Sequence, residues 1–186
     1  MVRKNEHMFE KMNITPLGMH ILTFLARNPD NQFYVREIAK LLNKSVGGVH
    51  KTLKSLFKMN FIKENISGKN VYYRINQMNP SIKNFKIFMS INELNPLVDH
   101  LKNISEKIIL FGSCVTGEDS SESDIDLFIL TTNKEDVKKY LKNNKFNREI
   151  QAVVVNTADF IKLKEQDKAF YKEIKKGITL WEEENE

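Results

Sequence analysis

Two aspartates, Asp124 and Asp126, stand at the start of an apolar run, shortly after the pair Gly112 and Ser113. Because successive side chains of a strand point to opposite faces, the i, i+2 spacing places both carboxylates on one face, with Cα atoms roughly 7 Å apart. Mg²⁺ prefers carboxylate oxygens and commonly shares its shell with substrate phosphates. Gly112 lets the backbone approach a ligand closely, and Ser113 would open a short helix whose free N–H groups suit a phosphate. The pattern predicts a site for Mg²⁺ and a phosphorylated substrate.

Each part of this pattern is common by itself, because Asp-x-Asp arises by chance and Gly-Ser is an ordinary turn. The joint pattern is stricter. A strand ends in Gly-Ser, Gly117 and a polar segment follow, and Ser123 opens the Asp-x-Asp-Leu run into a second strand. A carboxylate pair that leads into an apolar run is costly to bury without compensation. These features together favour a functional site over two unrelated turns.

Residues 107–131 resemble the signature of the minimal nucleotidyltransferases in the DNA polymerase beta superfamily. The resemblance implies that the contacts to a nucleoside triphosphate (NTP) are Gly112, Ser113 and Ser123. It implies that Asp124 and Asp126 are catalytic metal ligands, with two Mg²⁺ ions expected.

The family usually supplies a third carboxylate from a later strand, and the candidate strand here is 148–155. Glu149 is its only acid, so the resemblance implies that Glu149 completes the metal site or acts as a base. Gln151 is the alternative occupant of the position where an acid is expected. Many relatives also carry a basic residue in the turn after Gly-Ser, where this chain has 114–116, Cys-Val-Thr.

The resemblance implies Mg²⁺-dependent transfer of a nucleoside monophosphate from an NTP to a hydroxyl of a protein or nucleic acid. Similar minimal domains occur as antitoxins that modify a partner toxin, so a small helical partner protein is one expected acceptor. The alternative is a transcriptional regulator whose nucleotidyltransferase domain is a nucleotide sensor or an inactive remnant.

The N-terminal part resembles a winged helix-turn-helix domain. Helical periodicity predicts helices over 17–26, 34–42 and 45–59, with Ser45 as the cap of the third. Two short apolar segments, 61–65 and 71–75, flank a Ser-Gly-Lys-Asn turn and predict a β-hairpin.

Small, polar or basic side chains occupy the outward positions of the third predicted helix, as a helix approaching a DNA groove requires. The residues expected to contact duplex DNA are Lys44, Ser45, Gly47, Gly48, His50, Lys51, Lys54 and Lys58, with Lys69 and Arg74 on the hairpin. The alternatives are a solvated face, with the glycines easing packing between the second and third helices, or a module for dimerisation, protein interaction or RNA binding.

The chain is expected to form an α+β protein in which residues 1–78 are the winged helix, 79–105 a helical linker and 106–186 a small mixed α/β domain. The linker is expected to break near Asn95-Pro96. Its apolar stripe of Phe85, Ile87, Phe88 and Ile91 would pack on the hairpin or form a homodimer seam. Beyond it, strands are predicted at 107–111, 124–131, 148–155 and 177–181, and helices at 133–143, with Asn133 as cap, 157–165 and 167–176.

Composition and charge indicate a protein with packed cores, without disulfides, and with two differently charged parts. A chain of 186 residues with 41% hydrophobic content supports packed cores, and its single cysteine excludes a disulfide framework and fits a reducing cytoplasm. Residues 1–78 carry 13 Lys and Arg against 5 Asp and Glu, whereas 79–186 carry 16 against 19. This asymmetry indicates two domains with different partners. No apolar run reaches transmembrane length and no signal peptide is evident, so no membrane partner is expected.

Overall fold

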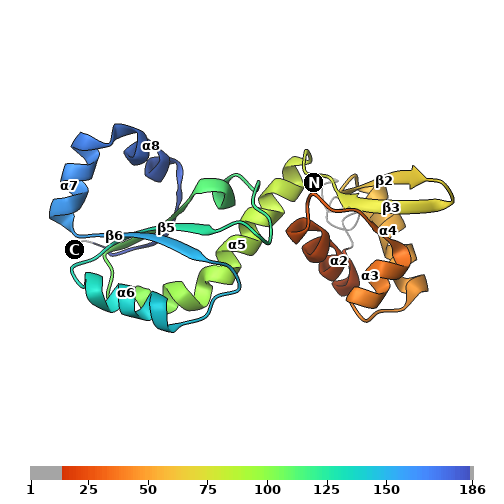
Figure 1. Cartoon of the computed structure of the whole chain (residues 1–186), viewed down its shortest axis with the longest axis horizontal. Helices are drawn as coiled ribbons and strands as arrows, with labels where there is room; N and C mark the ends of the chain where they lie inside the picture. The colour runs from red at the N-terminus through yellow and green to blue at the C-terminus, as the bar shows by residue number, and fades with distance from the viewer. Residues whose placement is uncertain (1–13, 185–186) are drawn as a thin grey trace, which may run out of the picture. The chain divides into compact units, whose positions relative to one another are not determined.

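The computed structural model describes residues 14–184, and the chain divides into two compact units, Met1–Ile82 and Lys83–Glu186 (Figure 1). Each unit has its own sheet, with strand order β1-β3-β2 in the N-terminal unit and β6-β5-β4-β7 in the C-terminal unit. The α+β class expected from the sequence is confirmed. Within residues 14–184, no helix combines the length and apolar content that a membrane span needs.

The N-terminal unit contains a bundle of helices, α2 (Pro16–Arg27), α3 (Val35–Leu41) and α4 (Val46–Lys58). Pro16 occupies the first turn of α2, where its missing N–H costs nothing. The predicted cap of α4 is confirmed, because the Ser45 hydroxyl accepts a hydrogen bond from the Gly48 N–H at 3.2 Å. The helices meet through fully buried aliphatic side chains, including Ile21, Leu22, Leu25, Ile38, Val49, Leu53 and Leu56.

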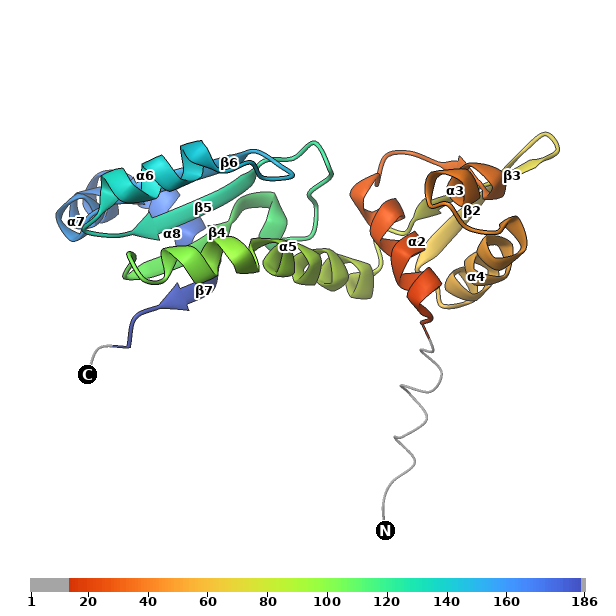
Figure 2. The ribbon, with the colours of Figure 1, turned by 90° about the horizontal axis from the view of Figure 1, so that it is seen from below.

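The hairpin predicted after the third helix is formed by β2 (Ile62–Ser67) and β3 (Asn70–Ile75), and Gly68 supplies the positive φ of 60° in its turn. Figure 2 shows the hairpin projecting beyond the helices of its unit. A third strand, β1 (Phe33–Tyr34), pairs antiparallel with β3. Tyr34 lies in this strand and at the cap of α3, not inside the second helix as predicted, because a two-residue strand has no detectable periodicity. Helices, hairpin and extra strand form a winged helix, as expected.

The C-terminal unit is a sheet covered by helices on both faces (Figure 1). Its helices are α5 (Pro80–Leu101), α6 (Lys134–Asn143), α7 (Thr157–Gln166) and α8 (Lys168–Lys176). Its strands are β4 (Lys107–Phe111), β5 (Ile125–Leu130), β6 (Ile150–Val155) and β7 (Ile178–Glu182). The short 3₁₀ helix η1 (Gly112–Val115) follows β4. Every predicted strand is present in the structure, within one or two residues of its expected ends.

Alternation along the strands creates two cores in this unit. Leu110, Leu127 and Ile129 face the layer of α5 and α6. Ile109 and Phe128 face the layer of α7 and α8. Strand β5 pairs antiparallel with β4 and parallel with β6, so the predicted mixed sheet is confirmed.

Helix α5 is more continuous than predicted. It continues through Pro96 without the expected break, and the buried Leu94 and Leu97 stabilise it on either side. Phe88 of the expected apolar stripe is 58% exposed, which is compatible with the predicted homodimer seam, and that seam stays a prediction. The buried side chains recur instead every three or four residues as Lys86, Ser90, Leu94, Leu97 and Leu101. Two polar residues thus share the buried face of this helix, which packs into the core of the C-terminal unit.

The start of α6 also differs from its prediction. Asn133 occupies the cap position, but its side chain makes no capping hydrogen bond. The Asn133 N–H instead donates to the Thr131 hydroxyl at 2.9 Å. The chain therefore enters this helix through a turn built by Thr131.

Candidate functional site

The Gly-Ser turn lies directly against the carboxylate of Asp126. In the antiparallel pairing of β4 and β5, Phe111 is opposite Asp126, so Gly112 follows at the end of the shared ladder. Gly112 has a φ of 72°, and a Cβ atom added there would lie 2.1 Å from Asp126 Oδ2. Only glycine fits this conformation and this distance. The backbone of the turn, with no side chain at Gly112, therefore lies in contact with the Asp126 carboxylate.

Asp124 lies close enough to Asp126 to influence the ionisation of its carboxyl. Burial, and then the neighbouring charge of Asp124, raise the pKa of the Asp126 carboxyl above its ordinary value. Both residues are half-buried, and alternation places them on the sheet face that carries Phe128. A cation between the carboxylates would relieve their mutual repulsion, so the donor set fits Mg²⁺.

The third carboxylate expected from β6 does not join this pair. Gln151 lies opposite Asp126 in the parallel register, and its side-chain amide donates to the carboxylate of Asp124. Glu149 is exposed and precedes the strand, where its carbonyl accepts from the Ile125 N–H at 2.8 Å. Across residues 14–184, no three His, Cys, Asp or Glu side chains are grouped to hold a metal ion. Glu149 thus lies apart from Asp124 and Asp126 in the structure, and the side chain next to the pair is the Gln151 amide, while the metal-binding role of the trio stays a prediction.

The two serines predicted as nucleotide contacts differ in their surroundings. The Ser113 carbonyl accepts from the Thr116 and Glu118 N–H groups, each at 3.2 Å, which closes the turn after η1. The Ser123 hydroxyl accepts from the Ser120 N–H at 2.9 Å, and the Ser123 N–H donates back to the Ser120 carbonyl. Ser123 thus shapes the loop that delivers Asp124.

Sequence reasoning missed a group of buried polar side chains behind this loop. Asp119 is fully buried, and Lys86, Ser90 and Arg148 are at most 7% exposed. Cys114 lies beside them, and burial, followed by the charge of Asp119, raises the pKa of its thiol. No motif or periodicity marks these residues, because in the sequence they are separate members of a loop, a helix and a strand end.

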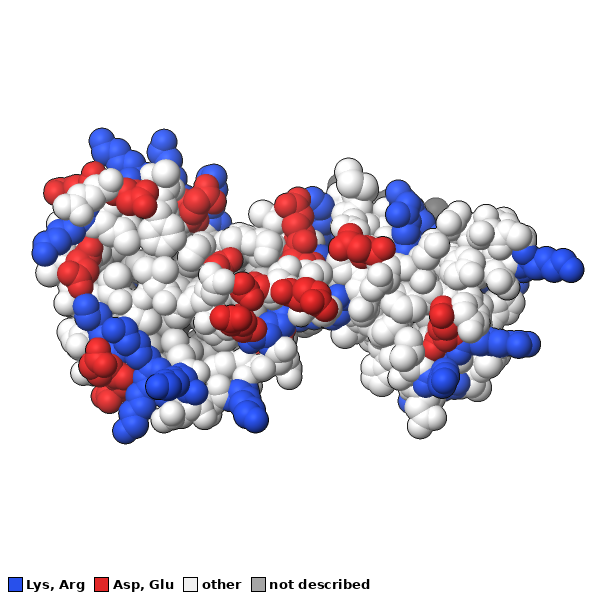
Figure 3. All heavy atoms as spheres, viewed as in Figure 1, with Lys and Arg blue, Asp and Glu red and all other residues white. Residues whose placement is uncertain are grey.

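Nearly all the residues predicted to contact DNA are exposed on the N-terminal unit. Lys44, Ser45, Gly47, His50, Lys51, Lys54, Lys58, Lys69 and Arg74 are exposed, and Gly48 is half-buried. Figure 3 shows Lys and Arg side chains projecting from this unit. Helix α4 and the hairpin therefore offer basic side chains to solvent, as the prediction requires.

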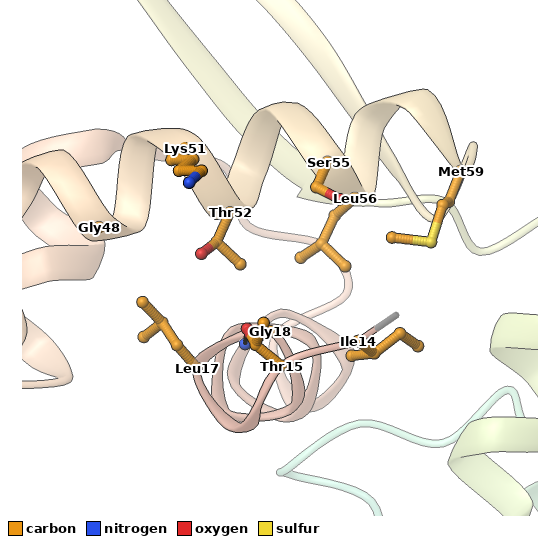
Figure 4. A pocket seen from close by; sticks show the side chains of 10 residues that line it. All are labelled: Ile14, Thr15, Leu17, Gly18, Gly48, Lys51, Thr52, Ser55, Leu56 and Met59. Atoms are coloured by element: carbon orange, nitrogen blue, oxygen red, sulfur yellow. Dashed lines mark hydrogen bonds between the residues drawn. The ribbon is translucent and has the colours of Figure 1, made fainter. Parts of the chain in front are cut away.

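Gly48 has a packing role that the sequence analysis assigned to a different helix pair. A Cβ atom there would lie 2.8 Å from Ser45 Oγ and 3.4 Å from Leu17 of α2. A pocket of about 330 Å³ lies between α2 and α4, and Lys51 is among its lining residues (Figure 4). The small residue thus eases packing between the first and third helices, and Lys51 lies at the edge of that contact.

Comparison with protein families identifies the C-terminal unit. A family model described as polymerase beta, nucleotidyltransferase matches residues 92–186, slightly more than half of the chain. The chain belongs to the polymerase beta nucleotidyltransferase family. The match begins within α5, so it includes the C-terminal part of this helix. The comparison with curated proteins gives no match.

Solved structures resemble the other half of the chain. A possible transcriptional regulator from Methanosarcina mazei Go1 is 18% identical with a TM-score of 0.37, covering 50% of this chain and 81% of its own. The adhesin competence repressor of Streptococcus pyogenes is 23% identical with a TM-score of 0.38, covering 52% and 72%. Reduced HlyU from Vibrio cholerae N16961 is 19% identical with a TM-score of 0.35, covering 52% and 97%. The winged-helix assignment rests on the elements of this chain, and these likenesses add no argument about function.

Proposed function

We propose that the nucleotidyltransferase domain binds an NTP with Mg²⁺ and transfers its nucleoside monophosphate to a hydroxyl of a protein or nucleic acid. The observation that carries this proposal is the Gly112 backbone held against the paired Asp124 and Asp126 carboxylates. This arrangement supports the proposal, because a glycine backbone that can approach a phosphate closely lies next to two carboxylates that suit Mg²⁺.

The reaction exchanges a phosphoanhydride bond of the NTP for a phosphoester bond to the acceptor. The acceptor oxygen forms a bond to the α-phosphorus, the bond from that phosphorus to the bridging oxygen of the β-phosphate breaks, and pyrophosphate leaves. The hydroxyl proton passes to solvent or to a base. Mg²⁺, when bound, neutralises charge on the triphosphate and on the leaving pyrophosphate.

Each residue of the site has a defined part in the proposal. Asp124 and Asp126 hold the ion, and Gly112 and Ser113 approach the triphosphate with backbone groups. Gln151 orients the Asp124 carboxylate through its amide. Glu149 is the candidate base, since it is exposed at the start of β6 rather than grouped with the pair.

A labelling experiment tests the transfer. The protein is incubated in a cell extract with Mg²⁺ and each NTP, labelled at either the α- or the γ-phosphate. Label from the α-phosphate alone should enter acid-insoluble material, and sensitivity to protease or nuclease then identifies the acceptor class. Asp124→Asn with Asp126→Asn should abolish labelling, because neutral amides do not compensate the triphosphate charge as metal-bound carboxylates do. The matched control, Asp136→Asn on the exposed side of α6, should label as the parent does.

A second candidate function is favoured by Gln151, which occupies the register position opposite Asp126. In that case the domain senses Mg²⁺–NTP without transferring it. Calorimetry separates the two, because a sensor binds Mg²⁺–NTP and labels nothing. Gln151→Glu should then raise Mg²⁺-dependent NTP affinity by supplying a third carboxylate. A parent protein that binds no NTP in Mg²⁺ would rule out both functions.

We also propose that the winged helix binds duplex DNA through α4 and the β2–β3 hairpin. The support is the exposure of its basic side chains, above all Lys54 and Lys58 on α4 and Lys69 in the hairpin turn. A helix with small and basic outward residues suits a major groove, and a basic hairpin suits the adjoining phosphates.

Salt dependence tests the DNA proposal. If the lysines contact phosphates, the logarithm of affinity should fall with the logarithm of salt concentration by about 0.9 per phosphate neutralised. Lys54→Ala or Lys58→Ala should weaken binding to all sequences and flatten this slope by about one unit. His50→Ala should instead change sequence preference, if His50 reaches base edges. Full-length protein that ignores a genomic DNA pool at low salt would contradict the proposal and favour protein interaction.

A further inference from the structure

The loop that carries Asp124 has little regular structure of its own. It runs from the end of η1 at Val115 to the start of β5 at Ile125, and its exposed members include Glu118, Ser121 and Glu122. Such a polar segment lacks the apolar contacts that normally hold a loop still. The position of the acidic pair therefore depends on other anchors.

One anchor is a close backbone contact with α5. Gly117 has a φ of 68°, and a Cβ atom added there would lie 2.5 Å from the backbone oxygen of Lys83. The loop is pressed against the helix at this point.

A second anchor is Asp119, whose side chain is fully buried in the middle of the polar loop. Its Oδ2 accepts from Arg148 Nη1 at 2.8 Å and from the Ser90 hydroxyl at 3.4 Å. Lys86 Nζ lies 3.7 Å from Asp119 Oδ1 and donates to the Asp119 carbonyl. Side chains of helix α5 thus bind both the carboxylate and the backbone carbonyl of Asp119.

Arg148 joins this anchor to the turn after β4. Its Nη1 also lies 3.4 Å from the Ser120 carbonyl and 3.6 Å from Cys114 Sγ, and Cys114 is the neighbour of Ser113. The Cys114 thiol in turn lies 3.9 Å from the Asp124 carbonyl. One guanidinium therefore contacts both the loop that leads to Asp124 and the turn that follows β4.

The charges of this group balance. The second nitrogen of Arg148, Nη2, donates to the Ser90 hydroxyl at 3.2 Å and to Glu93 at 3.1 Å. Two cations, Lys86 and Arg148, thus meet two carboxylates, Asp119 and Glu93. Buried ion pairs add little net stability over apolar side chains of the same size, but they fix geometry through directed hydrogen bonds.

We propose that Arg148 is a positioning residue, which with Asp119 locks the loop and the Gly-Ser turn so that Asp124 and Asp126 meet the bound Mg²⁺–NTP. The proposal rests on the nucleotide-binding role assigned above. It predicts that the contacts between Arg148 and Asp119 affect the arrangement of residues 112–124 more than the stability of the C-terminal unit.

A double substitution separates these two effects. Arg148→Met with Asp119→Leu removes one cation and one carboxylate together, so the net charge of the group is unchanged and Lys86 keeps its hydrogen bond to the backbone carbonyl of residue 119. The melting temperature should stay within a few degrees of the parent. Amide hydrogen exchange in residues 112–124 should accelerate at least about tenfold, because the loop opens more readily, while exchange in β4 and β7 stays unchanged.

Nucleotide affinity is the second readout. In the double variant, calorimetry with Mg²⁺ and each of the four ribonucleoside triphosphates should show affinity about 10- to 100-fold weaker, as expected for misplaced binding groups. Arg148→Lys should weaken it similarly, because an ammonium group cannot reproduce the forked contacts to Asp119 and Glu93. The matched control, Lys134→Met, breaks the 2.8 Å pair with Asp159 in the same unit and should match the parent in both readouts.

The outcomes are distinguishable from failure of the proposed function. If the parent binds no NTP, the nucleotide role is wrong, and exchange in residues 112–124 still decides whether Arg148 positions the loop. Unchanged exchange in that segment would overturn the proposal. Exchange that rises equally in loop and sheet would also overturn it, because the group would then only stabilise the unit.

Discussion

The two units place their charged side chains in opposite ways. In the N-terminal unit the described charged residues are exposed or half-buried, and its buried polar side chain is Asn76. The C-terminal unit buries Lys86, Asp119 and Arg148. A partner can meet the surface charges of the first unit directly. The buried charges of the second unit contact one another, so any effect on function passes through the loop that they hold.

Removing one buried charge should have the largest effect on stability. Asp119→Leu alone leaves Arg148 and Lys86 facing each other without their shared carboxylate, and should lower the unfolding free energy of the C-terminal unit by about 3–5 kcal/mol. Lys54→Met on the exposed face of α4 should change stability by less than about 0.5 kcal/mol. Trp181, the single tryptophan, lies in β7 and reports unfolding of the C-terminal unit in urea. If Asp119→Leu lowers the unfolding free energy by less than about 1 kcal/mol, the buried and the exposed charges do not differ in the way proposed.

Glycines in the two units should respond with opposite sign. Gly112→Ala must accommodate a φ of 72° and a Cβ atom 2.1 Å from Asp126 Oδ2, and should cost about 1–3 kcal/mol. Gly47 has open space where a Cβ atom would be added and lies in the first turn of α4, so Gly47→Ala should stabilise its unit by up to about 1 kcal/mol. Trp181 fluorescence follows the first variant, and far-ultraviolet circular dichroism follows the second. Equal effects would show that the Gly-Ser turn is more pliable than its geometry indicates.

The smallest contrast concerns helix caps. Ser45→Ala removes the hydrogen bond to the Gly48 N–H and should destabilise the N-terminal unit by about 1 kcal/mol. Asn133→Ala removes no capping hydrogen bond from α6, so it should stay within about 0.5 kcal/mol of the parent. Thermal unfolding of both variants measures the difference. A larger loss for Asn133→Ala than for Ser45→Ala would reverse the comparison.

The regular elements were predictable because local patterns determine them. Strand β4 is followed by a Gly-Ser turn, and β5 begins at the Asp-x-Asp pair. These residues indicate both where the strands end or begin and which chemistry the site could perform. The cap at Ser45 follows from one side chain and its own helix. The sequence left two candidates, Glu149 and Gln151, for the position next to the aspartates. Only the register of β6 decides between them, and it places Gln151 opposite Asp126.

The buried charges could not be predicted from local patterns. Arg148 contacts Asp119, Ser90 and Glu93, which lie 29, 58 and 55 residues away in the sequence. Lysine and arginine are usually exposed, so Lys86 interrupts the buried face of α5 where an apolar residue is expected.

The buried thiol of Cys114, between the Gly-Ser turn and the Asp-x-Asp pair, reports how often this segment opens locally. Cys114 is the only cysteine of the chain and is fully buried, so a thiol reagent reaches it only when the segment around it detaches. Its modification rate in the intact protein therefore measures how often that segment opens, without any introduced label. Added cysteines elsewhere could carry dyes while Cys114 stays unreactive under mild conditions.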